Sequence, residues 1–263
     1  MRTIRFEHNG QPTFGILEGD LETGTVQPIS GAPWEAHQPL GAAIAAGSVK
    51  LLPPVMPPTF YAAGLNYVEH IRHVAEGEGK APNIPTKPDI GYRAVNSLAA
   101  HGDDILIPPD AGERVHYEGE VVAVIGRKAK NLSEAEALDC VFGYTIGNDV
   151  SERDWQKEDR TFWRAKNCDT WAPMGPWIET NARLEDMQTT VRVNGQTIIE
   201  FPTNDMLFGV ARYISAMTRY LTLYPGDVIW MGTEGASPNM KAGDVCEISI
   251  SGIGTLRNTF RAG

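Results

Sequence analysis

Two glutamates separated by a single residue stand at the start of an apolar segment. Glu118 and Glu120 flank a glycine, and the next five residues, Val121–Ile125, are all apolar. In a β-strand, side chains two residues apart point to the same face, with Cα atoms about 7 Å apart. The two carboxylates would therefore share one face beside buried residues, where like charges raise each other's pKa. A divalent cation between them would relieve this repulsion.

A third carboxylate, Asp149, ends the next predicted strand, residues 142–149. A neighbouring strand is a plausible way to bring it to the glutamate pair. An all-oxygen set without cysteine suits Mg²⁺, Mn²⁺ or Ca²⁺ better than zinc. Spacing alone also fits a solvated strand edge, which is the usual role of two glutamates in this pattern. His116 shares their strand face, but a lone histidine there is more often a surface or hydrogen-bonded residue.

The N-terminal part that leads to these residues is predicted to form short strands. Apolar and polar positions alternate around turns over residues 1–30, which indicates a small sheet. A weak helical pattern covers residues 40–46. Leu52–Pro58 then contains four prolines, which do not fit inside a helix or a central strand. We therefore predict a small N-terminal domain over residues 1–52 and a main domain over residues 53–263.

The main domain is predicted to be strand-rich. Strands are expected at residues 118–125, 142–149, 228–231 and 245–250. Helices are expected at residues 133–140, opened by a Ser133–Glu136 capping box, and at residues 205–221, where apolar residues recur at helical spacing. A regular alternation of strands and helices is missing, which argues against Rossmann and TIM-barrel folds. The fold class predicted is α+β, built on a curled mixed sheet.

Composition excludes several classes of function. The chain has 263 residues, a formal net charge of −10 and three cysteines. An acidic protein lacks the basic face that nucleic acids and anionic membranes require. The cysteines are odd in number and far apart, so they predict neither a disulfide framework nor a zinc knuckle. No apolar run approaches the roughly 20 residues of a membrane span. We predict a cytoplasmic protein with a small-molecule partner and no contact with nucleic acid or membrane.

Six segments, in order along the chain, carry a resemblance to a known family. Ala63–His70 resembles the Gly-x-Asn-Tyr-x-x-His motif of the fumarylacetoacetate hydrolase family. Tyr117–Val121 is similar to its Tyr-Glu-x-Glu-Leu segment, and Gly147–Gln156 to its Asn-Asp-x-Ser-x-Arg-Asp-x-Gln loop. The remaining matches are Ala165–Pro176, Pro225–Thr233 and Gly252–Asn258. On these motifs the chain is identified as a member of that family.

The resemblance implies a fold, a cofactor and a class of substrate. It implies a metal bound by Glu118, Glu120 and Asp149, with Mg²⁺ or Mn²⁺ as the usual ion and Ca²⁺ as an occasional one. It also implies a homodimer. Family substrates are small 1,3-dioxo or enol acids, such as acylpyruvates and ring-cleavage products of aromatic compound catabolism. The family's reactions include hydrolytic carbon–carbon cleavage, decarboxylation and keto–enol isomerisation, and membership does not select among them.

The same motifs imply roles for individual residues. Lys166 would place its ammonium beside the negative charge that develops during the reaction. Thr233, after the glycine that ends a strand, would bind a substrate carboxylate. Arg93 stands where many members have a lysine and would keep a cation for an acidic substrate. Asn66 and Tyr67, within the first motif, would also contact the substrate.

His70 is the predicted general base, because imidazole titrates near neutral pH. Many family hydrolases pair this histidine with a glutamate three residues later, where this chain has His73. We expect Glu234, directly after the threonine of the Gly-Thr strand, to hold the imidazole instead. Glu76 and Glu78 are alternative partners.

The first function predicted is metal-dependent hydrolysis of a carbon–carbon bond in a small diketo acid, such as an acylpyruvate or a fumarylacetoacetate-like compound. Decarboxylation or isomerisation of a related oxo acid or hydroxymuconate-type acid at the same metal site is the alternative. The missing glutamate at position 73 favours this alternative. A protein that binds an oxo acid without converting it is the candidate from another class.

Overall fold

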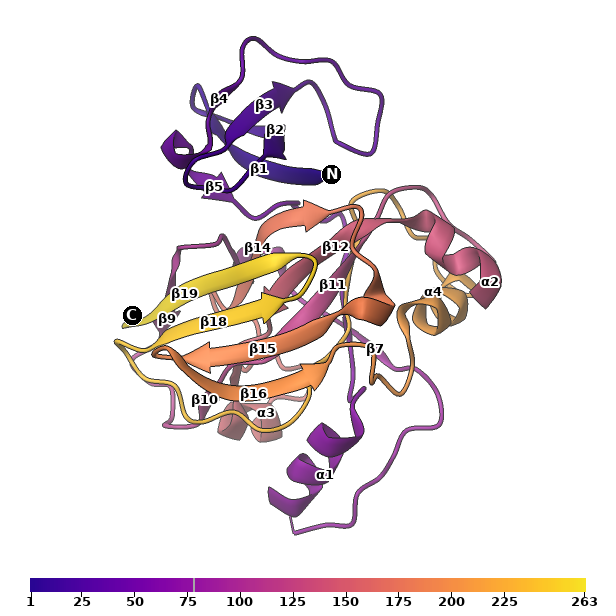
Figure 1. The fold of residues 1–263 in the computed structure, drawn as a ribbon. Coiled ribbons are helices and arrows are strands. Elements are labelled where there is room, and N and C mark those ends of the chain that lie inside the picture. The colour runs from indigo at the N-terminus through magenta and orange to yellow at the C-terminus, as the bar shows by residue number, and fades with distance from the viewer. Residues whose placement is uncertain (78) are drawn as a thin grey trace.

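The computed structural model describes residues 1–77 and 79–263, and β-strands form most of its regular structure (Figure 1). Twelve strands form one large sheet. In spatial order, its main path runs through β4 (Ile44–Ala45), β3 (Thr25–Ile29), β2 (Gln11–Glu18), β1 (Arg2–His8), β14 (Ala172–Glu179), β12 (Val141–Asn148), β11 (Gly119–Ile125), β17 (Val228–Trp230), β6 (Phe60–Ala63) and β7 (Ile90–Tyr92). The short strands β5 (Leu51–Leu52) and β8 (Leu98–Ala99) pair with β1 and β14.

A second sheet of five strands packs against the large one. Its order is β16 (Gln196–Pro202), β15 (Gln188–Val193), β18 (Val245–Ile250), β19 (Gly254–Ala262) and β9 (Asp104–Ile107). A two-stranded ribbon joins β10 (Val115–His116) and β13 (Ser151–Glu152). Because parallel pairs such as β6–β17 occur among antiparallel ones, the sheets are mixed, which confirms the predicted fold class.

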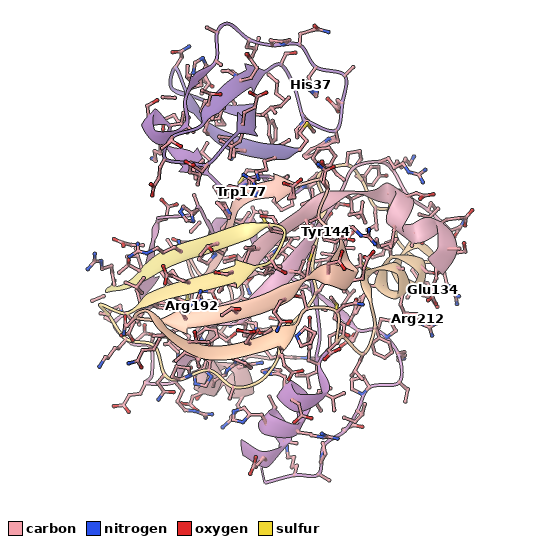
Figure 2. All side chains as sticks on the ribbon, in the orientation of Figure 1. His37, Glu134, Tyr144, Trp177, Arg192 and Arg212 are labelled. Carbon is pink, nitrogen blue, oxygen red and sulfur yellow. The ribbon has the colours of Figure 1, made fainter. Side chains whose placement is uncertain are left out.

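The helices are few and short. They are α1 (Val68–Gly77), α2 (Glu134–Ala137), α3 (Arg153–Glu158) and α4 (Val210–Thr218), with 3₁₀ turns at Ala46–Ser48, Val95–Ser97, Leu138–Cys140 and Leu184–Asp186. The predicted capping box is present at Ser133 and Glu136. Figure 2 shows Glu134 of α2 beside Arg212 of α4, joined by an ion pair of 2.5 Å. Within the described chain, no helix is long and apolar enough to cross a lipid bilayer.

The helix predicted over residues 40–46 is wrong. Within this segment Ile44–Ala45 form β4, in which Ile44 pairs with Val26, and a 3₁₀ turn follows. Gly41, inside the segment, has a φ of +72°, and Gly47 follows it, so too few residues remain to nucleate an isolated helix. The helix predicted over residues 205–221 is observed only as α4, Val210–Thr218.

The N-terminal strands continue the large sheet. β1 pairs with β14 through Arg2–Glu179 and Thr3–Ile178, so residues far apart in sequence share one ladder. In Figure 1 the first strands, in indigo, gather as a separate group above the rest of the molecule. The division of the chain at residue 52 stays a prediction.

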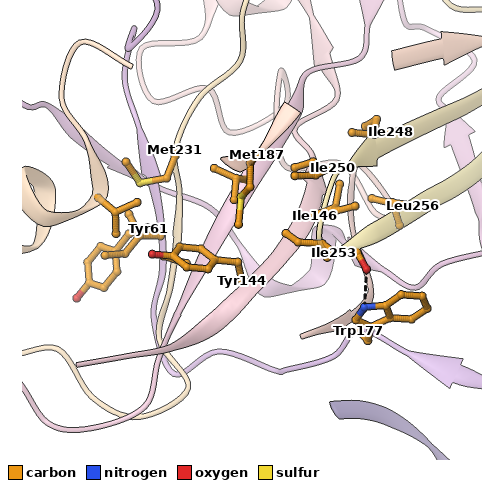
Figure 3. Close-up of a cluster of buried hydrophobic side chains, with 14 of the residues drawn as sticks. Tyr61, Tyr144, Ile146, Trp177, Met187, Met231, Ile248, Ile250, Ile253 and Leu256 are labelled. Atoms are coloured by element: carbon orange, nitrogen blue, oxygen red, sulfur yellow. Dashed lines mark hydrogen bonds between the residues drawn. The ribbon is translucent and has the colours of Figure 1, made fainter. Parts of the chain in front are cut away.

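The core lies between the two sheets (Figure 3). Ile146 of β12 packs in one buried cluster with Ile248 and Ile250 of β18. At the edge of this cluster, the Trp177 indole N–H donates to the Ile253 carbonyl at 2.8 Å. The centre of the large sheet is therefore covered on this face, and polar groups that emerge at the ends of β11 and β12 enter a largely dry environment.

Candidate functional site

Three buried carboxylates meet where β11 begins and β12 ends. The Gly119–Asn148 pairing fixes the register of the two strands, and the Asp149 N–H donates to the Glu118 carbonyl at 2.9 Å. One oxygen from each of Glu118, Glu120 and Asp149 lies within 4.8 Å of the others. All three residues are at most 6% exposed. The structure thus brings together the three carboxylates that the resemblance groups.

Three side-chain cations contact two of these carboxylates. The Lys166 ammonium lies 2.7 Å from both Glu118 Oε2 and Asp149 Oδ2. The Arg93 guanidinium binds Asp149 with two bonds, from Nε at 3.1 Å and from Nη2 at 2.7 Å. Arg153 Nη2 lies 2.7 Å from Glu118 Oε1. In the part of the chain that the structure describes, these cations pair with Glu118 and Asp149 and not with Glu120.

The glutamates differ in their electrostatic surroundings. Burial would raise the pKa of Glu118, but Lys166, Arg153 and His70 outweigh it and hold that pKa well below the usual range. The pKa of Glu120 is raised well above its usual value by burial and by the charges of Asp149 and Glu118. A backbone N–H, that of Gly232, donates to Glu120 Oε2 at 2.7 Å. Mutual repulsion therefore raises one glutamate pKa rather than both.

The donor set fits a hard divalent cation. All candidate ligand atoms are carboxylate oxygens, which Mg²⁺, Mn²⁺ and Ca²⁺ prefer over the sulfur and nitrogen ligands of zinc sites. In the described residues, Glu120 forms no ion pair with a side-chain cation, so the most repelled carboxylate is also the least compensated. A bound cation would supply that compensation.

His70 lies on α1 with its imidazole directed toward this cluster. The ring is buried, and Nε2 is 4.0 Å from Glu118 Oε1. Its other nitrogen, Nδ1, is 2.7 Å from the Gly235 carbonyl oxygen. Burial lowers the pKa of His70, and Arg153 and Lys166 lower it further, against the attraction of Glu118. The imidazole is therefore neutral near pH 7 and able to accept a proton.

Our expectation that Glu234 holds the imidazole is wrong in this structure. The Glu234 carboxylate accepts from the backbone N–H of Gly235 at 2.8 Å, and burial raises its pKa. The next residue's carbonyl takes the place at the ring because the chain turns sharply after the Gly-Thr strand. His73 and Glu76 are exposed on α1, and His73 borders the cavity. Glu78 lies outside the described residues.

The residues expected to bind substrate separate into two groups. Thr233 is buried and lines the cavity that contains the carboxylates. The amide of Asn66 is occupied by backbone groups: it donates to the Phe208 and Met231 carbonyls and accepts from the Phe208 N–H.

Tyr67 is fully buried, and its hydroxyl donates to the Thr203 carbonyl at 2.6 Å. The roles of Asn66 and Tyr67 in substrate binding stay predictions, and Asn66 lines the cavity that contains the carboxylates. Both side chains anchor the segment before α1, because each has its polar groups satisfied by main-chain partners.

Arg93, expected to provide a cation for an acidic substrate, lines the same cavity and contacts a candidate metal ligand. Its guanidinium is bound to Asp149, and the ion pair holds the pKa of Arg93 above its usual value despite burial. Other basic residues, Arg114 and Lys157, line the same cavity, whose volume is about 460 Å³. Sequence reasoning assigned them no role.

Two further groups at the site were missed. Arg153 lies in the motif that follows Asp149, and this position next to a candidate ligand was a usable signal. It also donates from Nε to His116 Nδ1 at 3.1 Å, so it links the ribbon β10–β13 to Glu118. No sequence pattern indicated the Gly235 carbonyl, because residue type does not determine the direction of a backbone carbonyl group.

Comparison with known proteins places this geometry in context. Residues 59–261 match the family model described as fumarylacetoacetate (FAA) hydrolase C-terminal, and residues 1–54 match the one described as Rv2993c-like, N-terminal. A 2,4-didehydro-3-deoxy-L-rhamnonate hydrolase of Sphingomonas sp. is 36% identical, covering 98% of this chain and 95% of that protein. The oxaloacetate tautomerase YisK of Bacillus subtilis is 30% identical, with coverages of 92% and 84%. Among solved structures, a 5-carboxymethyl-2-hydroxymuconate delta-isomerase from Mycobacterium smegmatis is 33% identical and superposes with a TM-score of 0.90 over 100% of both chains.

Proposed function

The chain belongs to the fumarylacetoacetate hydrolase family, and from this premise we propose that it is a metal-dependent isomerase of a small oxo acid. Members of this family act on small oxo acids by hydrolysis, isomerisation, decarboxylation or tautomerisation. The proposed reaction moves a proton at the carbon next to the carbonyl of the substrate, between keto and enol forms.

Glu118, Glu120 and Asp149 would hold the divalent cation, with Mg²⁺ or Mn²⁺ preferred for an all-carboxylate site. When bound, such an ion polarises a carbonyl and stabilises negative charge on its oxygen. Lys166, within 2.7 Å of two of these carboxylates, adds a positive charge at the same place. A buried ammonium beside a developing oxyanion acts without the screening of bulk water.

The observation that carries the proposal is the environment of His70. Nε2 faces the carboxylate cluster, while Nδ1 is bound to a backbone carbonyl. In the described residues, no carboxylate contacts the ring through Nδ1. A single neutral base can take a proton from carbon and return it to another atom of the same substrate. Hydrolysis gains more from a carboxylate that fixes the base and stabilises the imidazolium formed during water attack.

The cavity also suits an acidic substrate. Thr233 offers a hydroxyl, and Arg114 and Lys157, both ion-paired with Asp154, add positive charge to the cavity wall. Together with Arg93, these residues would bind a substrate carboxylate.

Hydrolytic cleavage of a carbon–carbon bond is the second candidate. It is favoured by the hydrolase from Sphingomonas, which aligns over nearly the whole chain. In this reaction His70 would deprotonate water, and Lys166 would face the oxyanion that follows attack on the carbonyl. Decarboxylation uses the same cluster without a base.

Product analysis separates these functions. The protein loaded with Mg²⁺ or Mn²⁺ would be incubated with acylpyruvates, oxaloacetate and hydroxymuconate-type acids, and the products followed by NMR. The proposal predicts interconversion of tautomers or double-bond isomers, abolished by a chelator. Two acids would establish hydrolysis instead, and CO₂ would establish decarboxylation. Every acid bound but unchanged would mean that the protein only sequesters its ligand.

A further inference from the structure

A backbone carbonyl at the His70 ring determines which ring nitrogen carries the proton. Nδ1 lies 2.7 Å from the Gly235 carbonyl oxygen. A carbonyl oxygen accepts hydrogen bonds and cannot donate them, so Nδ1 must carry the hydrogen. In the neutral imidazole, Nε2 then holds the free electron pair. Nε2 is the nitrogen that faces the carboxylate cluster, 4.0 Å from Glu118 Oε1.

Glu234 belongs to the same turn. Its carboxylate accepts from the Gly235 N–H at 2.8 Å, so it binds the backbone of the residue whose carbonyl contacts the His70 ring. Burial raises the pKa of Glu234, and the Gly235 and His70 backbone N–H groups act against this. Glu234 therefore holds the backbone of the turn, and the turn holds the ring of His70.

Gly235 gives this turn its shape. Its φ is +70°, a conformation that residues with a side chain rarely adopt, and a Cβ there would lie 2.2 Å from Ile199 Cδ1. A side chain at this position would be strained and would meet β16, so glycine is the residue that fits this turn. In this conformation the Gly235 carbonyl oxygen points at His70 Nδ1.

We propose that the turn at residues 234–235 locks His70 as the Nδ1-protonated tautomer, and that Glu234 is a positioning residue that acts through the backbone of Gly235. The assignment of Nε2 as the atom that takes the substrate proton rests on the proposed function. The tautomer and the role of Glu234 do not. A main-chain carbonyl here replaces the carboxylate partner that the sequence suggested.

NMR of the imidazoles tests the tautomer without any turnover. The full-length protein, labelled with ¹⁵N-histidine and loaded with diamagnetic Mg²⁺, would be studied at about pH 8, where an unperturbed imidazole is neutral. His70→Gln identifies the signals of His70 among the six histidines. We expect a protonated Nδ1 and an unprotonated Nε2. A protonated Nε2, or fast exchange between both forms, would overturn the proposal. The spectrum is recorded without substrate, so it tests the tautomer independently of the proposed isomerase activity.

Two substitutions of Glu234 test how it acts. Glu234→Gln keeps a side-chain oxygen that accepts from the Gly235 N–H, so we expect the wild-type tautomer and a kcat close to that of the wild type. Glu234→Ala removes the acceptor, and we expect tautomer exchange with a kcat lower by about 10²-fold, the scale of a misplaced catalytic group. Substrate KM should change much less.

The matched control is Glu69→Gln, which removes a charge from the same turn of α1 at an exposed position. It should leave kcat and tautomer unchanged. Thermal unfolding would verify that all variants are folded. If Glu234→Gln lowers kcat as far as Glu234→Ala, the carboxylate charge acts on the imidazole and our assignment is wrong. Wild-type kcat and tautomer in Glu234→Ala would equally refute it.

Discussion

At the scale of single residues, the site combines buried carboxylates with the cations that contact them. Sequence spacing predicted only the carboxylates. Glu118, Glu120 and Asp149 were grouped because strand periodicity and the family motifs place them together. Their cations come from separate segments, and only a folded chain shows that Arg93 and Arg153 point into the cluster. The place of a residue in the sequence does not determine where a long, flexible basic side chain points in the fold.

Arg93 should compete with a divalent cation for Asp149. Their ion pair is buried, with side chains 7% and 2% exposed. Arg93→Met leaves Asp149 less compensated, so the metal-free protein should lose stability, by about 3 kcal/mol if the cost is typical of a broken buried pair. A metal restores the missing charge, and its stabilisation grows with its affinity. Thermal unfolding should therefore show a lower Tm without Mg²⁺ and a larger rise with it.

Arg212→Met provides the comparison for Arg93→Met. It removes an exposed ion pair with Glu134, and such pairs contribute little to stability. Its Tm and its response to Mg²⁺ should match those of the wild type. An equal Mg²⁺ response in Arg93→Met and wild type would show that Arg93 and the metal do not compete.

His116 should make the protein sensitive to acid. Burial and the nearby Arg153 lower its pKa from 6.5 to about 4. Between these values the unfolded chain binds a proton that the folded chain does not, so stability falls as pH falls through this window. His116→Gln cannot take up that proton, so its free energy of unfolding should fall less steeply. Urea unfolding at several pH values measures both slopes, and parallel slopes would contradict the prediction.

At the scale of elements, strand register positions the site. The β11–β12 pairing places Glu118 beside Asp149, and β17 lies on the other side of β11. Sequence patterns found these central strands because long apolar runs identify buried strands. They missed α3, which is short, and misassigned residues 40–46. Such segments take their conformation from tertiary contacts rather than from local propensity.

Gly147 should be required for this register. A Cβ at Gly147 would lie 2.5 Å from the buried ring of Trp230. Overpacking of this kind costs about 1–3 kcal/mol, so Gly147→Ala should lower Tm. Adding Trp230→Phe removes the atoms that clash, and the double variant should be more stable than additivity predicts.

Gly209→Ala is the matched control for Gly147→Ala. Its Cβ would meet open space, and its φ is an ordinary −68°. We expect a Tm close to that of the wild type. Should Gly147→Ala behave like Gly209→Ala, the contact with Trp230 does not limit the packing of β12.

At the scale of the whole molecule, the strand-rich fold was predictable from composition and pattern, but the joining of the N-terminal strands to β14 was not. That pairing links residues more than 170 positions apart, and local patterns carry no information on it. The cytoplasmic location and the homodimer remain predictions.

A homodimer should be measurable in solution. Trp163 and Tyr92 are 66% and 56% exposed and border a groove of about 860 Å³ that Arg93 also lines. Exposed aromatic surface of this kind is typical of protein interfaces. Light scattering should give about 57 kDa, twice the chain mass of 28.7 kDa. A mass of one chain across a wide range of concentrations would refute the dimer.

The central claim is that His70 transfers a proton at the carbon next to the carbonyl of a small oxo acid. Incorporation of solvent deuterium at that carbon, followed by NMR in D₂O with a 2-oxo acid that the protein binds, measures this step directly. The Mg²⁺-loaded wild type should exchange well above the rate in buffer. His70→Gln should exchange about 10²-fold more slowly, the lower end of the range for general-base catalysis. Equal exchange in His70→Gln and wild type, or no exchange above buffer with any 2-oxo acid bound, would contradict the account.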